Sequence, residues 1–305
     1  MLLYFLDFVS LSPSMGGTNS NSSRFFQRLW MYIRKFLFSI LCVGPIPDHI
    51  AFIMDGNRRY AKKQKLEEGS GHKAGFLALM SLLKYCYELG VKYTTIYAFS
   101  IDNFRRRPEE VQYVMDLMLE KIEGLLKEES IVNQFGVRVS FVGNLKLLNE
   151  AVRVAAEKVM IATANNTKTR LLICVAYTSS DEIVNAVQES CREKWHGIKA
   201  LNGMKNDEIQ ALDGEMSEEY QEKNPGIKLV DLEKNMYMAI APDPDILIRS
   251  SGETRLSNFL LWQATNTLLC CPRALWPEMG LWNLVWAVLK FQRNYSYMEK
   301  KKKQL

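Results

Sequence analysis

The chain has 305 residues, of which 48% are hydrophobic and 24% are charged, and this composition excludes fibrous and intrinsically disordered proteins. Lysine and arginine (39) outnumber aspartate and glutamate (34), so the formal net charge is +5. This excess fits anionic substrates or a membrane surface, and it is too small and too scattered to indicate nucleic acid as a partner. The six cysteines form no CxxC pair and the three histidines add no zinc-ligand spacing, so we expect reduced thiols in a reducing compartment.

The first 43 residues differ in pattern from the rest of the chain. Residues 1–23 are an apolar segment followed by a linker rich in Gly, Ser and Asn, without the basic start of a signal peptide. Residues 24–43 predict an amphipathic helix whose polar face gathers basic side chains and whose remaining surface is aromatic and aliphatic. Such a helix lies in a membrane interface or packs against the domain or a partner, and the pattern leaves both open. No segment reaches the roughly 18 apolar residues of a membrane-spanning helix.

Short β-rich runs then alternate with longer helical patterns. The predicted strands are residues 49–55, 93–99, 137–143, 171–177, 245–249 and 267–271. The predicted helices are residues 72–89, 108–135, 147–165, 181–195 and 277–295. Continuous apolar strands separated by helices predict an α/β fold with a mainly parallel six-stranded sheet covered by helices on both faces. Residues 44–296 are expected to form a single domain that carries a polar surface insertion at 197–235, followed by a basic tail at 297–305.

Polar side chains collect where the predicted strands end, and open parallel sheets build their sites at that edge. The strand 49–55 ends in Asp55, and four polar or flexible residues follow it: Gly56, Asn57, Arg58 and Arg59. Glycine permits a sharp turn, arginine offers a forked donor to oxyanions, and a carboxylate is a ligand for hard divalent cations. This segment therefore suits a magnesium-bound diphosphate, with a solvated, internally paired turn as the alternative.

Three further clusters are candidates for anion binding. Residues 69–75 open a helix with glycines and His72, which is otherwise a helix cap or a packing residue. Ser100 and Asn103 follow a strand and precede the arginines at 105–107, whose charge beside a helix N-terminus is better explained by a nearby anion than by solvent. The most specific cluster surrounds a glycine turn and contains Arg249, Arg255 and Ser257.

The alternative for this last cluster is a structural network through Glu253. Two oxyanion sites, one with a metal-competent carboxylate, predict an enzyme that joins two diphosphate-bearing substrates. A phosphohydrolase is not favoured, because no nucleophile or two-metal carboxylate set is identifiable.

Four motifs together resemble the cis-prenyltransferases, the undecaprenyl and dehydrodolichyl diphosphate synthase family. They are HIAFIMDGNRRYAKK (49–63), GHKAG (71–75), YAFSIDNFRRRPEEV (97–111), and DILIRSSGETRLSNFLLWQ (245–263) with LWPE (275–278). The resemblance covers about residues 45–294 in order. The trans-prenyltransferases, which are all-helical and carry DDxxD motifs, are excluded as a model.

The resemblance implies condensation of isopentenyl diphosphate onto an allylic diphosphate, such as farnesyl diphosphate, to give a long-chain cis-polyprenyl diphosphate of the dehydrodolichyl type. It implies that Mg²⁺ is the cofactor and that Asp55 positions the magnesium diphosphate. The allylic diphosphate is expected to contact Gly56, Asn57, Arg58, Arg59, His72 and Arg106. The diphosphate of isopentenyl diphosphate is expected to contact Arg249, Arg255 and Ser257, with Ser100 and Asn103 near the reacting carbons. Candidate residues for an apolar tunnel, with ordinary core packing as the equal alternative, are Met80, Leu83, Met115, Leu119 and Ile122.

The chain departs from the family pattern in places. Glu68 stands where family members often have arginine, and Leu268 stands where bacterial relatives have a glutamate metal ligand. Residues 297–305 contain no Arg-x-Gly, the motif with which homodimeric bacterial relatives end. The resemblance to eukaryotic members therefore implies a heteromer in which a scaffold subunit of the same fold supplies this motif, at the cytosolic face of the endoplasmic reticulum membrane.

Two alternatives stay open at this point, namely a non-catalytic scaffold subunit and synthesis of a rubber-type polymer. A scaffold subunit is expected to have lost the acid and the arginine clusters, which this chain retains. Product length, the preferred allylic primer and the identity of the partner do not follow from the sequence.

Overall fold

The computed structural model describes residues 20–67, 69–127, 130–208 and 226–303, and the structural statements below concern these residues. Residues 1–19 and Glu68 lie outside them. Six strands form one sheet in the order β3-β4-β2-β1-β5-β6, and each neighbouring pair is parallel. The strands are β1 (His49–Ile53), β2 (Tyr93–Ser100), β3 (Val137–Val142), β4 (Thr169–Tyr177), β5 (Ile246–Arg249) and β6 (Leu268–Cys270). The predicted parallel α/β sheet is confirmed.

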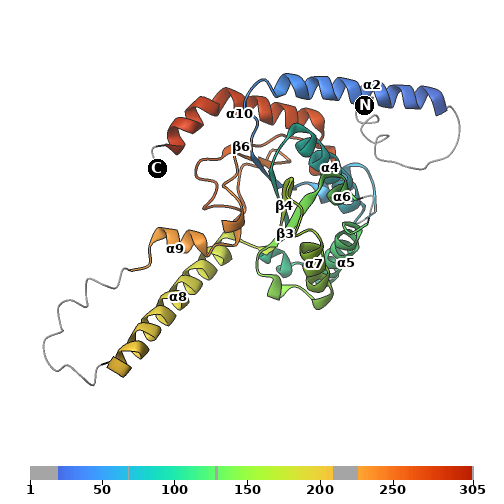
Figure 1. Cartoon of the computed structure of the whole chain (residues 1–305). Helices are drawn as coiled ribbons and strands as arrows, with labels where there is room; N and C mark the ends of the chain where they lie inside the picture. The colour runs from blue at the N-terminus through green and yellow to red at the C-terminus, as the bar shows by residue number, and fades with distance from the viewer. Residues whose placement is uncertain (1–19, 68, 128–129, 209–225, 304–305) are drawn as a thin grey trace.

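The apolar runs of the central strands serve two separate cores. Ile50 and Phe52 of β1 belong to the larger core, whereas Ala51 and Ile53 belong to the smaller one, because successive side chains of a strand point to opposite faces. The larger core joins the sheet to α4 (Ser70–Leu89), α5 (Pro108–Gly124), α7 (Glu150–Ala162) and α10 (Leu281–Lys302). The smaller core is closed by η4 (Tyr237–Ile240), residues 256–263 and the start of α8 (Ser179–Glu208), a helix that extends away from the domain (Figure 1).

The remaining elements are short. They are α3 (Asn57–Lys63), α6 (Ile131–Phe135), α9 (Leu229–Lys234), η1 (Ile101–Arg105), η2 (Leu145–Leu147) and η5 (Trp276–Glu278). The prediction of one helix over residues 108–135 is wrong. α5 ends at Gly124, where glycine weakens a helix, and α6 begins after Ser130, whose hydroxyl caps it by accepting a hydrogen bond from the Asn133 N–H at 3.4 Å.

The last helix also begins later than the sequence predicts. Pro277 lies in the 3-10 turn η5, which Glu278 closes by accepting a hydrogen bond from the Leu275 N–H at 3.1 Å. α10 starts at Leu281 and continues to Lys302, so residues 297–302 are helical. The Lys302 ammonium pairs with Asp245 Oδ1 at 2.9 Å.

The N-terminal helix α2 (Ser20–Leu41) packs against the domain with a face that only partly follows its amphipathic pattern, because this face includes Arg34 beside the apolar Trp30. Its Arg34 side chain is buried, with Nε 2.8 Å from Glu88 Oε2 on α4 and the guanidinium over the Tyr85 ring at 5.4 Å. Phe36 is exposed, although the pattern places it on the apolar face and Arg34 on the polar one. The paired charge and the cation–π contact explain how arginine is tolerated inside.

Candidate active site

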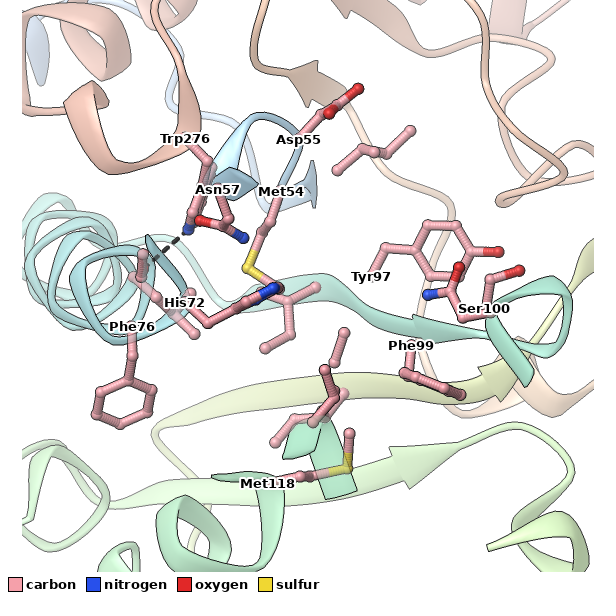
Figure 2. A pocket seen from close by; sticks show the side chains of 18 of the residues that line it. Met54, Asp55, Asn57, His72, Phe76, Tyr97, Phe99, Ser100, Met118 and Trp276 are labelled. Atoms are coloured by element: carbon pink, nitrogen blue, oxygen red, sulfur yellow. Dashed lines mark hydrogen bonds between the residues drawn. The ribbon is translucent and has the colours of Figure 1, made fainter. Parts of the chain in front are cut away.

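The polar clusters predicted from separate parts of the sequence meet at one edge of the sheet. The strands β2, β1 and β5 are adjacent, and their carboxyl ends carry Ser100, Asp55 and Arg249 respectively. A cavity of about 740 Å³ opens there, and Figure 2 shows some of its lining side chains. Ten of the twelve predicted site residues line it, namely Asp55, Asn57, Arg58, His72, Ser100, Asn103, Arg106, Arg249, Arg255 and Ser257.

The other two predicted residues support this cavity from its rim. Arg59 Nη2 lies 3.3 Å from Asp55 Oδ1. Gly56 has φ +110°, and a Cβ atom there would lie 2.5 Å from Ser251 Oγ, so both the backbone conformation and the space require glycine.

An ion pair between Asp55 and Arg249 forms the centre of the site. Arg249 Nη2 donates to Asp55 Oδ2 at 2.8 Å, while its Nη1 donates to Ser257 Oγ at 2.6 Å and to the Arg255 carbonyl. The Arg249 side chain is 6% exposed and that of Asp55 is 26% exposed. Burial alone raises the pKa of Asp55, but hydrogen bonds and charge from Arg249 and then Arg59 outweigh it and hold that pKa below its usual value. The two predicted anion sites therefore share one charged pair.

On the α4 side of the cavity, glycines bring helices together. A Cβ at Gly75 would lie 2.2 Å from Asn57 Oδ1, and one at Gly71 would lie 2.1 Å from the Asn57 carbonyl oxygen. The indole N–H of Trp276 donates to the Gly75 carbonyl at 2.9 Å, the dashed line in Figure 2. The glycines of the GHKAG motif thus let α4 approach α3 closely enough to place Asn57 in the cavity.

His72 and Arg106 form a neighbouring group. Arg106 donates to Glu110 Oε1 at 2.9 Å and to Asn103 Oδ1 at 3.1 Å, which fixes its direction. Burial, followed by the positive charge of Arg106, lowers the pKa of His72. Both effects favour the neutral imidazole of His72, which carries one N–H donor.

Sequence reasoning missed two residues that support the Ser257 side of the site. Tyr97 lines the cavity, and its hydroxyl donates to the Tyr177 carbonyl at 3.0 Å. Glu182 is fully buried and accepts hydrogen bonds from the Tyr177 hydroxyl, the Met238 N–H and the Gln263 amide. Burial raises the pKa of Glu182. The position of Glu182 just after the end of a strand was the signal that could have identified it from the sequence. A glutamate in the first turn of a helix is, however, more often solvated.

The Glu182 network holds a loop with unusual backbone geometry. Ser257, Asn258 and Leu260 all have positive φ, between +48° and +58°. Residues other than glycine adopt this region at a cost, so the conformation persists only where surrounding contacts impose it. Ser179 Oγ adds to these contacts by accepting the Leu261 N–H at 2.9 Å.

The inner part of the cavity is apolar. Of the candidate tunnel residues, Met80 and Ile122 line it, while Leu83 and Met115 are buried in the core and Leu119 lines a separate groove between α5 and α7. The prediction was wrong for these last three, because helical spacing does not say which side of the helix faces the cavity. Side chains that line it without having been predicted include Phe76, Leu79, Leu117, Met118, Phe141 and Ile173.

The side chains available as metal ligands limit how a metal ion could be held. The described residues contain no group of three or more His, Cys, Asp or Glu side chains placed to bind a metal. Glu253 is paired with Arg59 and Arg255, and Leu268 is the first residue of β6. Mg²⁺ is commonly held by one or two carboxylates together with substrate phosphates. The residues present fit that arrangement, in which Asp55 would be the protein ligand.

Comparison with known proteins identifies the family of the chain. The model of the undecaprenyl diphosphate synthase family matches residues 53–298. The chain belongs to this family. It is therefore a cis-prenyltransferase, as its motifs predict, and the family match spans the strand ends and the cavity described above.

Similar proteins come from plants and animals. The chain is 64% identical to dehydrodolichyl diphosphate synthase 6 of Arabidopsis thaliana, over 93% of this chain and 95% of that protein. It is 60% identical to rubber cis-polyprenyltransferase HRT2 of Hevea brasiliensis, over 94% and 98% of the two chains. It is 41% identical to the human dehydrodolichyl diphosphate synthase complex subunit DHDDS, over 89% and 74%.

A solved structure agrees with the fold. Lavandulyl diphosphate synthase from Lavandula x intermedia, crystallised in complex with dimethylallyl diphosphate, superposes with a TM-score of 0.67 at 26% identity. The match covers 81% of this chain and 95% of the other.

Proposed function

We propose that this chain is a catalytic subunit that condenses isopentenyl diphosphate onto an allylic diphosphate such as farnesyl diphosphate. The product is a long-chain cis-polyprenyl diphosphate of the dehydrodolichyl type. The observation that carries the proposal is the Asp55–Arg249 ion pair, which joins two clusters of phosphate-binding donors at the mouth of one apolar cavity. A scaffold subunit without activity has no need for such a pair.

The allylic substrate is assigned to the α3–α4 side of the cavity. Asn57, His72 and the guanidinium groups of Arg58 and Arg106 line that side and offer donors to its diphosphate. As the allylic C–O bond breaks, negative charge grows on the departing diphosphate, and donors already in place stabilise it without reorganisation. Asp55, with diphosphate oxygens, would hold Mg²⁺, which neutralises part of this charge when bound.

Isopentenyl diphosphate is assigned to the β5 side. Arg249, Arg255 and Ser257 bind its diphosphate and direct its double bond toward the allylic carbon that loses the diphosphate. The new carbon–carbon bond forms there, and the isopentenyl unit then loses a proton to the released diphosphate to give the cis double bond. Ser100 ends β2 and Asn103 lies in η1, and both line the same cavity, so we assign them to the neighbourhood of the reacting carbons.

The cavity volume bears on the product. At about 30 Å³ per heavy atom, the share of a water molecule in the liquid, a five-carbon unit fills about 150 Å³. The cavity of about 740 Å³ therefore holds at most about five such units, because this volume also includes the polar mouth assigned to the diphosphates. A chain longer than this extends beyond the cavity, so the enclosed volume does not fix the final length.

A second subunit is proposed to complete the isopentenyl site. The Arg255 side chain is 63% exposed and is paired with Glu253, which leaves this side of the cradle open to solvent. We assign the opening to a C-terminal Arg-x-Gly segment from a scaffold subunit of the same fold. The human relative's name as a complex subunit supports a partner of this kind.

The proposed location is the cytosolic face of the endoplasmic reticulum membrane. Among the described residues no helix is long and apolar enough to cross a bilayer. α2 leaves Leu29, Tyr32 and Phe36 exposed beside Arg28 and Lys35, a combination typical of helices that lie in the interface.

The test is reconstitution with labelled substrates. The chain is purified alone and with a candidate scaffold subunit, and incorporation of labelled isopentenyl diphosphate is measured with farnesyl diphosphate and Mg²⁺. We expect strong activation by the partner and loss of activation when its Arg-x-Gly is replaced. Full activity of the isolated chain would refute the heteromer, and no condensation under any condition would refute the catalytic assignment. Reverse-phase separation of the dephosphorylated products gives their length.

A further inference from the structure

The C-terminal helix α10 exposes large aromatic side chains along one side. Trp282 is 52% exposed and Trp286 is 48% exposed, and the exposed Leu289 continues the same stripe at helical spacing. Tyr297, two turns further on, is also exposed. The opposite side of the helix is buried in the larger core. Exposed apolar side chains that form a continuous stripe of this size mark a surface that contacts a membrane or another protein.

Cations accompany this stripe. Lys290 Nζ lies 5.3 Å from the centre of the Trp286 ring, and Arg293, Lys300 and Lys301 are exposed further along the helix. α10 contains one acidic residue, Glu299, and α2 contains none. Tryptophan and tyrosine beside lysine and arginine are enriched where a protein meets lipid headgroups.

The two helices lie on the same side of the molecule. Gln292 of α10 donates to the Leu41 carbonyl at the end of α2 at 2.7 Å, and both helices pack on the larger core. Figure 1 shows them along one side of the domain. Since each buries its inner face in that core, their exposed stripes both point away from the sheet.

We propose that α10 and α2 together form one docking face for a bilayer with anionic headgroups. The tryptophans of α10 enter the interface, and the basic residues at its C-terminal end lie over lipid phosphates. This proposal rests on the membrane contact proposed above for α2 and adds α10 to it. The α2 contact was argued without α10. A bilayer is favoured over a protein partner because the apolar stripes are flanked by cations with almost no acidic residue among them.

The test is binding of the full chain to vesicles, which is read independently of condensation. Sedimentation is measured with phosphatidylcholine vesicles and with phosphatidylcholine–phosphatidylserine vesicles. For Trp282→Ser with Trp286→Ser we expect about tenfold weaker binding, the factor that corresponds to 1.4 kcal/mol. For Lys300→Gln with Lys301→Gln we expect a loss confined to the anionic vesicles. Trp195→Ser is the matched control, because Trp195 is 58% exposed on α8, away from this face, and its replacement should leave binding unchanged.

Several outcomes would overturn the proposal. Unchanged vesicle binding by the folded double tryptophan variant excludes α10 from the face. α10 is also excluded if deletion of residues 20–41 abolishes binding while the α10 variants bind normally. If that variant binds vesicles normally but no longer binds a protein partner, the face is a protein interface. If the serine variant fails to fold, the double variant Trp282→Phe with Trp286→Phe is used instead, and quenching of tryptophan fluorescence by brominated lipid is measured. Wild-type quenching should then exceed that of the phenylalanine variant, and equal quenching contradicts the proposal.

Discussion

Replacing Asp55 with alanine removes two things at once, the proposed metal ligand and the counter-ion of a buried arginine. Arg249 loses one charged hydrogen bond, worth about 1.5–3 kcal/mol, and keeps its bonds to Ser257 and the Arg255 carbonyl. We expect a stability loss near the lower end of that range, because the partly exposed Asp55 position admits water to the guanidinium. A domain stable by about 5–15 kcal/mol stays folded after such a loss. Turnover should fall by about 10²-fold or more, because the lost charge acts mainly in the transition state.

The assay combines urea unfolding with steady-state incorporation of labelled isopentenyl diphosphate. Asp55→Asn preserves the side-chain shape and should lose turnover with a smaller change in stability. Asp116→Ala is the control, since this exposed acid on α5 accepts a hydrogen bond from the exposed Gln112 and its replacement should change neither quantity. Near-normal turnover in a folded Asp55→Ala protein would refute the reasoning. A stability loss well above about 3 kcal/mol would show instead that the carboxylate is mainly structural.

Three further predictions concern the surroundings of this pair, and a fourth concerns the N-terminal helix. Arg249→Ala and Arg255→Ala should mainly raise the KM for isopentenyl diphosphate, and a rise confined to the allylic substrate would reverse the two assignments. Arg249→Ala should also move the acid limb of the kcat profile to higher pH. Arg249 lowers the pKa of Asp55, so without it the carboxylate is protonated at a higher pH, and an unmoved limb in a pH titration would contradict this. Glu182→Ala should destabilise the protein, at about 1–3 kcal/mol for each buried donor left without a partner, and should raise the isopentenyl KM through the Ser257 loop. Partial rescue of that KM by Glu182→Gln separates positioning from general destabilisation, and an unchanged KM would remove the loop from the site. Deleting residues 1–39 should move the protein from membrane to soluble fractions. The deletion should also lower the melting temperature, because Trp30 and Phe38 of α2 are buried. Unchanged sedimentation would point to anchoring through other elements.

The sequence by itself determined the fold class and the edge at which the site lies. Residues 50–54 are continuously apolar because both faces of this strand are covered, and that pattern is readable without knowing which residues cover it. Once the strands are parallel, their carboxyl ends must share one edge, so Asp55, Ser100 and Arg249 lie along the same edge of the sheet whatever the loops do.

Tertiary structure decided what periodicity leaves open. The direct contact between Asp55 and Arg249, 194 residues apart, depends on β1 and β5 being adjacent, which no local pattern encodes. Spacing shows that α5 has an apolar side but not that Met118 faces the cavity while Met115 faces the core. Likewise, Arg34 of α2 is buried because Glu88 and Tyr85 on another helix receive it. A helix carries its apolar residues in the sequence, but the neighbours that receive each face exist only after the chain has folded.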